Sequence, residues 1–330
     1  MRVAITGPTG SIGVDLMRLH LKAGDEVIAV VNPESKRISN IPKGVEIVRC
    51  DISDYKNIFG TNECELFYHL AWAGTGPESR DDTSIQSKNI QYTLDAVCLA
   101  KSWGTKKFIG AGSQAEYGPL DQPINRNTPT NPISAYGIAK YASGKLCEIE
   151  CKKNGIEFNW VRILSVFGKY DNENSLVIYL IDTLLKGERP KMTDCEQIWD
   201  LISSEDCARA LKLVAIDGKI DKTYVIGSGD SKKLKEYVES IKNLIDPDME
   251  IDYGAIPDYS KQTRCLSADI SELIKDTGFS PERKFEDSIE GLIEYRRSHM
   301  KLRYQSSAIR FLQFLSPSSA PFLNQYMAFS

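Results

Sequence analysis

The chain has 330 residues, of which 42% are hydrophobic and 26% are charged, as in an ordinary globular protein. A net charge of −4 with scattered basic residues argues against nucleic acid as a partner, and no apolar run is long enough to span a membrane. The length suits one large domain that carries a smaller lobe.

Cysteine and histidine are too scattered to predict a metal centre. The eight cysteines include no CxxC pair, and the whole chain has three histidines. We therefore expect no metal site, reduced thiols and a cytoplasmic location. A strand is expected within three residues of the first one, which leaves no room for a signal peptide.

The first predicted unit is a strand, a glycine-rich turn, a helix and a second strand. Residues 2–6 (RVAIT) and 26–31 (EVIAVV) are runs of β-forming residues, and apolar residues recur at helical spacing between them. Gly7 would permit the tight turn, Gly10 would let the backbone approach a pyrophosphate, and Gly13 would let the helix pack closely on the sheet. This arrangement predicts a dinucleotide site at the helix N-terminus, in preference to a chance glycine loop.

The end of the second strand indicates which dinucleotide binds. NAD enzymes usually carry an acidic residue there for the adenosine ribose, whereas this chain has Asn32 followed by Lys36 and Arg37. Two cations in place of a carboxylate favour the 2′-phosphate of NADP over NAD, although solvated loop charges would look the same. Asp51, after a third strand, is placed to reach the adenine ring.

Strands and helices continue to alternate along the chain. Residues 65–74 (ELFYHLAWAG) and 106–113 (KKFIGAGS) are predicted as strands, with a helix between them over 87–104. Such alternation predicts an α/β fold, a Rossmann-type doubly wound parallel sheet, whose ligands bind beyond the carboxyl ends of the strands.

Tyr136 and Lys140 are four residues apart on a predicted helix and so share one face. An ammonium beside a phenol lowers the phenol pKa from about 10, which allows proton transfer near neutral pH. Ser113 could hydrogen-bond the substrate oxygen with which Tyr136 exchanges a proton. Tyr141 and Lys145 repeat the spacing, but five residues turn a helix by more than a third of a rotation, so both pairs cannot face one site. Two solvent-facing pairs would be the ordinary interpretation, and Ser113 favours the first pair as catalytic.

Several motifs occur in one order with sensible spacing: GxxGxxG, Asp51-Ile52, HLAWAG, Asn89, a serine followed by EYG, and YxxxK. Together they resemble the extended short-chain dehydrogenase/reductase superfamily, in its nucleotide-sugar epimerase/dehydratase branch. The later segments VRILSVFG, QIWDLISSEDCARAL, TYVIGSG and SADISELIKDTGFSP are similar to further motifs of that branch. The resemblance covers about residues 1–295.

The resemblance implies a role for each matched residue. Tyr136 would be the acid/base, Lys140 would bind the nicotinamide ribose and tune the tyrosine, and Ser113 would bind the reacting oxygen. The cofactor, NADP or NAD, would lie against Gly7, Thr9, Gly10, Ser11, Ile12, Gly13, Asn32, Arg37, Asp51, Ile52, Leu70, Ala71, Trp72, Asn89, Tyr136 and Lys140. The nucleotide-sugar substrate would lie against Thr75, Ser113, Gln114, Ser165, Asn174 and Arg264. Family members often dimerise through the helices that carry Asn89 and Tyr136, which implies a homodimer.

The expected division of the chain follows the same resemblance. Residues 1–167 and about 198–228 would form the NAD(P)-binding Rossmann domain. Residues of about 168–197 and 229–298 would form the nucleotide-sugar-binding lobe. The tail, 299–330, lies outside the resemblance and could be a docking helix, an oligomer contact or a disordered end.

Departures from the family pattern indicate the reaction. The 4,6-dehydratases carry Asp and Glu where this chain has Gln114 and Ala115, so water elimination is not expected. A 4-ketoreductase and a 4-epimerase remain. Asn32 with Arg37, and Ser165 where epimerases carry asparagine, favour reduction of a 4-keto-6-deoxy sugar nucleotide for surface polysaccharide synthesis. A non-catalytic NAD(P) sensor is a further alternative, although such proteins usually lose the Tyr–Lys pair.

Overall fold

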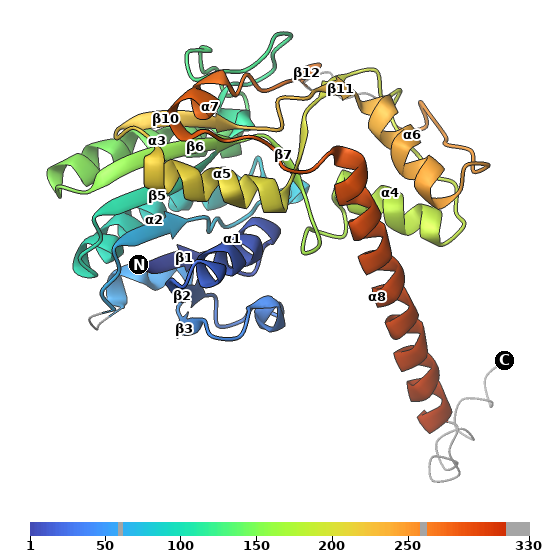
Figure 1. Ribbon diagram of the computed structural model, residues 1–330, viewed down its shortest axis with the longest axis horizontal. Helices are drawn as coiled ribbons and strands as arrows, with labels where there is room; N and C mark the ends of the chain where they lie inside the picture. Colours follow the sequence, from blue (N-terminus) through green and yellow to red (C-terminus); the bar gives the residue numbers. More distant parts are fainter. Residues whose placement is uncertain (59–61, 258–262, 315–330) are drawn as a thin grey trace.

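A seven-stranded parallel sheet forms the centre of the computed structural model, which describes residues 1–58, 62–257 and 263–314 (Figure 1). The strand order is β10-β6-β5-β4-β1-β2-β3. The strands are β1 (Arg2–Thr6), β2 (Glu26–Val31), β3 (Glu46–Arg49), β4 (Leu66–His69), β5 (Lys107–Ser113), β6 (Glu157–Ile163) and β10 (Lys222–Ile226). The order reverses direction beside β1, so a crevice for a ligand forms beyond the carboxyl ends of β1 and β4. The predicted doubly wound α/β fold is confirmed.

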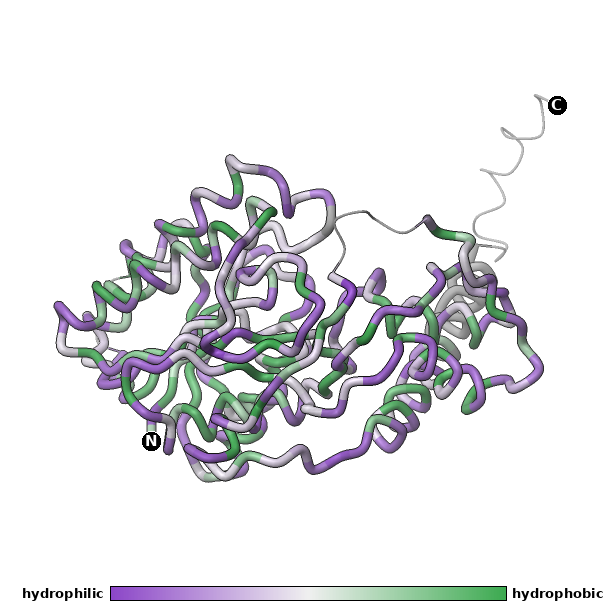
Figure 2. Tube along the Cα trace, turned by 90° about the horizontal axis from the view of Figure 1, so that it is seen from above, coloured by the Kyte–Doolittle hydropathy of each residue, from purple (hydrophilic) through white to green (hydrophobic). Residues whose placement is uncertain are grey.

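Helices cover both faces of the sheet. On one face, α1 (Ser11–Lys22) packs against α5 (Ser204–Asp217), and on the other α2 (Thr83–Ser102) packs against α3 (Ala135–Lys153). Each pair buries its apolar side chains in a separate core, because the strands between them are apolar on both faces. Figure 2 shows hydrophobic segments concentrated in the sheet region and hydrophilic ones mainly at the periphery.

A third core lies beside the sheet, among α4 (Leu176–Leu185), α6 (Leu234–Ile245) and the first turns of α8 (Phe285–Phe314). Arg296 of α8 forms an ion pair with Asp182 of α4, which fixes the two helices together. Short strands lead into this part: β7 (Ser165–Phe167) pairs with β9 (Leu201–Ser203), and β8 (Ile198–Trp199) pairs with β11 (Lys232–Lys233) and β12 (Cys265–Leu266). Helix α7 (Ser271–Thr277) packs back on α5.

In the described part of the chain, four short 3-10 helices connect the larger elements: η1 (Ile38–Asn40), η2 (Ile52–Asn57), η3 (Pro77–Ser79) and η4 (Gln114–Glu116). In the predicted tail, residues 299–314 continue α8, which extends away from the body in Figure 1. Residues 315–330 lie outside the described part.

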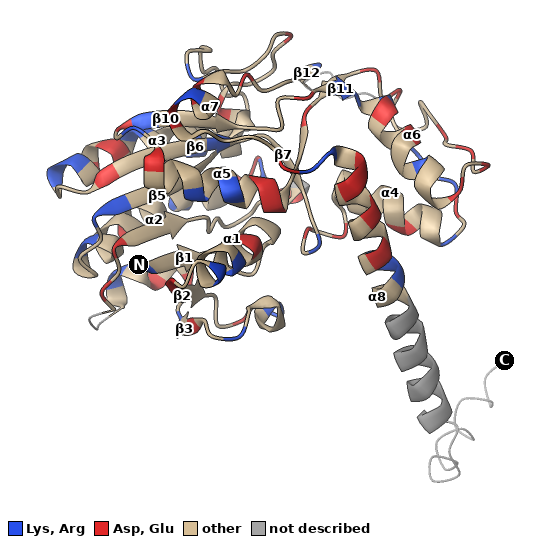
Figure 3. Ribbon diagram, in the orientation of Figure 1, with Lys and Arg blue, Asp and Glu red and all other residues tan. Residues whose placement is uncertain are grey.

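The described surface carries both signs of charge. Figure 3 shows acidic and basic residues interspersed along the helices of both halves. None of the described helices combines the length and apolarity needed to cross a bilayer.

Candidate active site

The turn after β1 has the shape that a dinucleotide needs. Gly7 has φ +66°, and a Cβ on it would lie 2.8 Å from the nitrogen of Ala71. A Cβ on Gly13 would lie 2.7 Å from the carbonyl oxygen of Gly7, so both positions require glycine. A Cβ on Gly10 would meet only one atom, at 3.8 Å, because this glycine faces open space at the start of α1. The N-cap Gly10 supplies no side-chain hydrogen bond, so the helix start is available to an anion such as a pyrophosphate.

The loop after β4 is fixed over this turn by Thr6. Its hydroxyl accepts hydrogen bonds from the nitrogens of Leu70 and Ala71, both at 3.2 Å, and contacts Nδ1 of His69 at 3.0 Å. Asn89 of α2 holds the next residues, because its amide bonds both the nitrogen and the oxygen of Ala73 at 2.9 and 2.8 Å. The structure thus brings the Gly7 turn, Leu70, Ala71 and Asn89 to one edge of the sheet.

At the predicted adenosine end, Asn32 and Asp51 contact each other. The Asn32 amide donates to Oδ2 of Asp51 at 2.7 Å. Oδ1 of Asp51 accepts from the nitrogen of Ser53, so Asp51 caps the start of η2, which contains Ile52. Arg37 is exposed and donates to the carbonyl oxygen of Tyr170, at 3.4 Å.

The loop after β7 joins the same edge. The nitrogen of Tyr170 donates to the hydroxyl of Ser11 at 3.0 Å, at the first residue of α1. Thr9 is buried in the glycine turn, and Ile12 is partly buried against the core that α1 covers. The predicted cofactor residues therefore lie in the segments that follow β1, β2, β3 and β4 and on the helices α2 and α3.

Ser113 and Tyr136 meet at the carboxyl end of β5. Ser113 is the last residue of this strand, and Tyr136 lies in the first turn of α3. Burial raises the pKa of Tyr136, and a hydrogen bond with the Ser113 hydroxyl opposes that rise. The serine and tyrosine that the sequence pairs are thus in contact.

Lys140 lies one turn further along α3 and is buried. Its ammonium donates to the carbonyl oxygen of Ala111 at 2.7 Å and lies 3.7 Å from the centroid of the Trp72 ring. It is 5.9 Å from the centroid of the Tyr136 ring. Burial lowers the pKa of Lys140 to about 7.

Arg80 is a neighbour of Tyr136 that the sequence analysis missed. Its guanidinium carbon lies 4.6 Å from the centroid of the Tyr136 ring, and it lowers the pKa of the phenol against the effect of burial. The Trp72 ring meets Tyr136 edge-on, with centroids 5.9 Å apart. The only sequence signal for Arg80 is its place in the loop between HLAWAG and the next helix.

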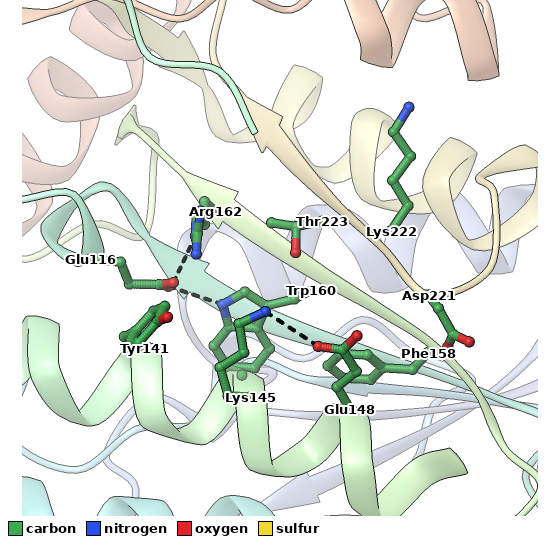
Figure 4. Close-up of a pocket in the computed structure, with 11 residues that line it drawn as sticks. Glu116, Tyr141, Lys145, Glu148, Phe158, Trp160, Arg162, Asp221, Lys222 and Thr223 are labelled. Atoms are coloured by element: carbon green, nitrogen blue, oxygen red, sulfur yellow. Dashed lines mark hydrogen bonds and ion pairs between the residues drawn. The ribbon is translucent and has the colours of Figure 1, made fainter. Parts of the chain in front are cut away.

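A buried carboxylate supports the end of β5. Oε1 of Glu116 accepts from the nitrogen of Ser113 at 2.8 Å and from Nε1 of Trp160 at 2.9 Å. Oε2 accepts from Arg162 at 2.7 Å (Figure 4). Glu116 is fully buried, so this network fixes the backbone that carries Ser113.

The second YxxxK pair lies elsewhere. Tyr141 and Lys145 line the small pocket of Figure 4 beside Trp160, and Lys145 pairs with Glu148 at 3.4 Å on the surface. The two pairs therefore face different surroundings, as the helical rotation predicts.

The predicted substrate residues are spread over several segments. Gln114 follows Ser113 directly and begins η4, and Ser165 begins β7. Thr75, Asn174 and Arg264 are exposed, in the loop after β4, before α4 and before β12 respectively. Gln114 thus adjoins the Ser113 and Tyr136 pair, whereas these exposed residues are in more distant parts of the chain. Among the residues described, no cluster of three or more His, Cys, Asp or Glu side chains could hold a metal ion.

A glycine turn at the strand-order reversal and a Ser–Tyr–Lys set after β5 define a dinucleotide-dependent enzyme of the short-chain dehydrogenase/reductase class. The model of the NAD dependent epimerase/dehydratase family matches residues 3–227, and the chain belongs to this family. The family resemblance that the sequence motifs indicate is confirmed.

The relatives match most of this chain. "Putative UDP-glucose 4-epimerase" of Methanocaldococcus jannaschii is 24% identical over 90% of this chain and 99% of its own. The dTDP-6-deoxy-L-talose 4-dehydrogenase (NAD(+)) of Aggregatibacter actinomycetemcomitans is 26% identical over 72% of this chain and 88% of its own. The structure of the Thermotoga maritima UDP-glucose 4-epimerase with UDP-glucose superimposes with a TM-score of 0.84 and 23% identity, over 91% of this chain and 100% of that one.

Proposed function

We propose that this protein transfers hydride at C4 of a nucleotide-activated hexose, with Tyr136 as the acid/base. The observation that carries the proposal is the contact of Tyr136 with Ser113 at the carboxyl end of β5, in a chain whose family is NAD-dependent. The names of the relatives, which describe 4-epimerase and 4-dehydrogenase activities on nucleotide sugars, support the same carbon.

The chemistry assigns one task to each residue of the set. A nicotinamide cofactor held at the Gly7 turn and by Lys140 would supply the acceptor and donor of the C4 hydride. Tyr136 would take the proton of the C4 hydroxyl as a carbonyl forms, and would return it in the reverse step. Ser113 would orient the sugar oxygen toward the phenol. Lys140, once charged, would bind the ribose hydroxyls and favour the phenolate.

As the particular reaction we propose 4-epimerisation with retained NAD. This differs from the preference for reduction that the sequence alone supports, because relatives with epimerase names cover nearly the whole chain. Gln114 and Ala115 carry no carboxyl group, which still argues against water elimination.

Reduction of a 4-keto-6-deoxy sugar nucleotide is the second candidate. Asn32 and the exposed Arg37 beyond β2 favour it, since they suit the 2′-phosphate of an exchangeable NADPH. The 4-dehydrogenase relative supports hydride exchange at this carbon as well, although its printed cofactor is NAD(+).

We also propose the division of labour that the sequence suggests. Residues 1–167 and about 198–228 would bind the cofactor. Residues 168–197 and 229–298 would bind the nucleotide sugar, and the separate apolar core of α4, α6 and α8 supports treating them as one lobe. All eight cysteines lie in described segments and none is in a disulfide, which supports a reducing cytoplasm.

The experiment that separates the two reactions is identification of the nucleotide released when freshly purified protein is denatured. Stoichiometric NAD by mass spectrometry would support the epimerase, because an epimerase recycles its cofactor. Protein that releases no nucleotide and then binds NADPH more tightly than NADH would overturn the epimerase in favour of the reductase.

A further inference from the structure

We propose that Arg80 is a positioning residue that holds Tyr136 and stabilises its phenolate, a role that Lys140 alone does not fill in this protein. The inference rests on the proposed function, because it assigns a task to the acid/base named there. It adds a residue from a loop that carries none of the recognised sequence motifs.

The backbone fixes Arg80 beside α3. The nitrogen of Tyr136 donates to the carbonyl oxygen of Arg80 at 2.9 Å. The nitrogen of Ala135 donates to Oδ1 of Asp81 at 3.1 Å. The segment after η3 therefore covers the N-terminus of α3, and the Arg80 guanidinium lies over the Tyr136 ring, 4.6 Å from its centroid.

Lys140 is less well placed for this task. Its ammonium is 5.9 Å from the same centroid and is bound to the carbonyl oxygen of Ala111 and the face of Trp72. Its pKa is lowered to about 7 by burial, so it carries only part of its charge near neutral pH. A guanidinium stays charged throughout this range, and Arg80 is therefore the permanent cation against the phenol.

The other charges at the site do not replace Arg80. The charged groups that act on Tyr136 are Arg80 and Glu116 of η4. Lys140 of α3, Asp81 after η3 and His69 of β4, which the Lys140 charge reaches, lie around them. His69 is neutral, because burial and Lys140 lower its pKa to about 3. Glu116 raises the pKa of Tyr136, although Arg162 neutralises part of its charge at 2.7 Å. Asp81 is occupied at the helix start.

The test compares Arg80→Gln and Arg80→Lys with the unaltered full-length protein loaded with NAD. A cation in contact with a phenol shifts its pKa by at least about one pH unit, so Arg80→Gln should raise the pKa of Tyr136 by that amount. The value of kcat/KM near neutral pH should fall about tenfold and recover at higher pH. Arg80→Lys should restore most of the original pH profile. Arg2→Gln is the matched control, because Arg2 pairs with Glu46 at 2.6 Å at the amino end of β1, away from the strand ends that carry the site.

A second readout does not need turnover. The near-ultraviolet absorbance of the phenolate, taken as the difference from Tyr136→Phe, should titrate at higher pH in Arg80→Gln and near its original pH in Arg80→Lys. An unchanged titration in folded Arg80→Gln would overturn the role of Arg80. If no nucleotide sugar is turned over by the unaltered protein, the proposed function fails, while this titration still decides the role of Arg80.

Discussion

The ammonium of Lys140 lies 3.7 Å from the centroid of the Trp72 ring. The indole is itself held by a hydrogen bond from its Nε1 to Gln86, at 2.9 Å. A lysine enclosed in this way loses water around its charge, and the ring, one carbonyl oxygen and the charge of Glu116 compensate only in part. This enclosure makes the charge state of Lys140 dependent on pH in the working range.

The enclosure predicts a pH dependence of stability. The pKa of Lys140 is about 7 in the folded protein and near its ordinary value of 10.5 when unfolded. Between these values only the unfolded chain binds the proton, so this lysine makes the free energy of unfolding rise with pH across that window. Denaturant unfolding of the unaltered protein and of Lys140→Met at a series of pH values measures the effect. The free energy of unfolding of the unaltered protein, minus that of Lys140→Met, should rise from about pH 7 upward. A value that stays constant with pH would contradict the prediction.

The glycine turn predicts opposite results for two alanine variants. In Gly10→Ala the new Cβ meets one atom at 3.8 Å, so folding should be unaffected while NAD affinity falls, because the methyl group occupies the pyrophosphate approach. In Gly13→Ala the Cβ lies 2.7 Å from backbone, so the free energy of unfolding should fall by about 1–3 kcal/mol. Calorimetric NAD titration and denaturant unfolding of both variants test this. Full NAD affinity in Gly10→Ala would show that the cofactor lies elsewhere.

The buried Glu116 predicts a large loss of stability. Glu116→Ala leaves the Arg162 guanidinium buried without its carboxylate, which should lower the free energy of unfolding by about 3–5 kcal/mol. Glu148→Ala is the control, because that carboxylate pairs with Lys145 at the surface and its loss should cost at most about 0.5 kcal/mol. Equal losses in the two variants would contradict this, because the Glu116 network would then add no more stability than a surface ion pair.

The surface of α3 predicts a homodimer. Ile138, Leu146 and Ile149 are 52%, 41% and 54% exposed along one side of this helix, beside α2. We expect Ile149→Lys to shift the mass in sedimentation from dimer to monomer, because a charge would be buried between the copies. Ile216→Lys is the control, since Ile216 is 52% exposed on α5, across the sheet. A monomeric unaltered protein would contradict the prediction.

Local sequence patterns were sufficient to predict the strands and the turn that form the scaffold of the site. The runs RVAIT and EVIAVV predicted β1 and β2, and the glycine spacing predicted the turn, because these features depend on residues close in the chain. The positions of Ser113, Tyr136 and Lys140 in the fold were predictable, because each lies at an end or on one face of an element.

Contacts between distant residues could not be predicted in this way. Glu116 and Arg162 are 46 residues apart, and no periodic pattern links them. Arg80 reaches Tyr136 only because the loop after η3 covers α3, and loop paths are not encoded by hydrophobic spacing. The placement of Lys140 against Trp72, further from the Tyr136 ring than Arg80 is, depends on the same side-chain packing.

The most direct test of the central claim is hydride transfer in a single turnover, with Tyr136→Phe compared against Tyr141→Phe. The NAD-loaded protein is mixed with a panel of UDP- and dTDP-hexoses, and the absorbance of reduced nicotinamide is followed. We predict a transient signal in the unaltered protein and in Tyr141→Phe, and none in Tyr136→Phe despite normal NAD binding. An equal signal in Tyr136→Phe would show that another residue is the acid/base.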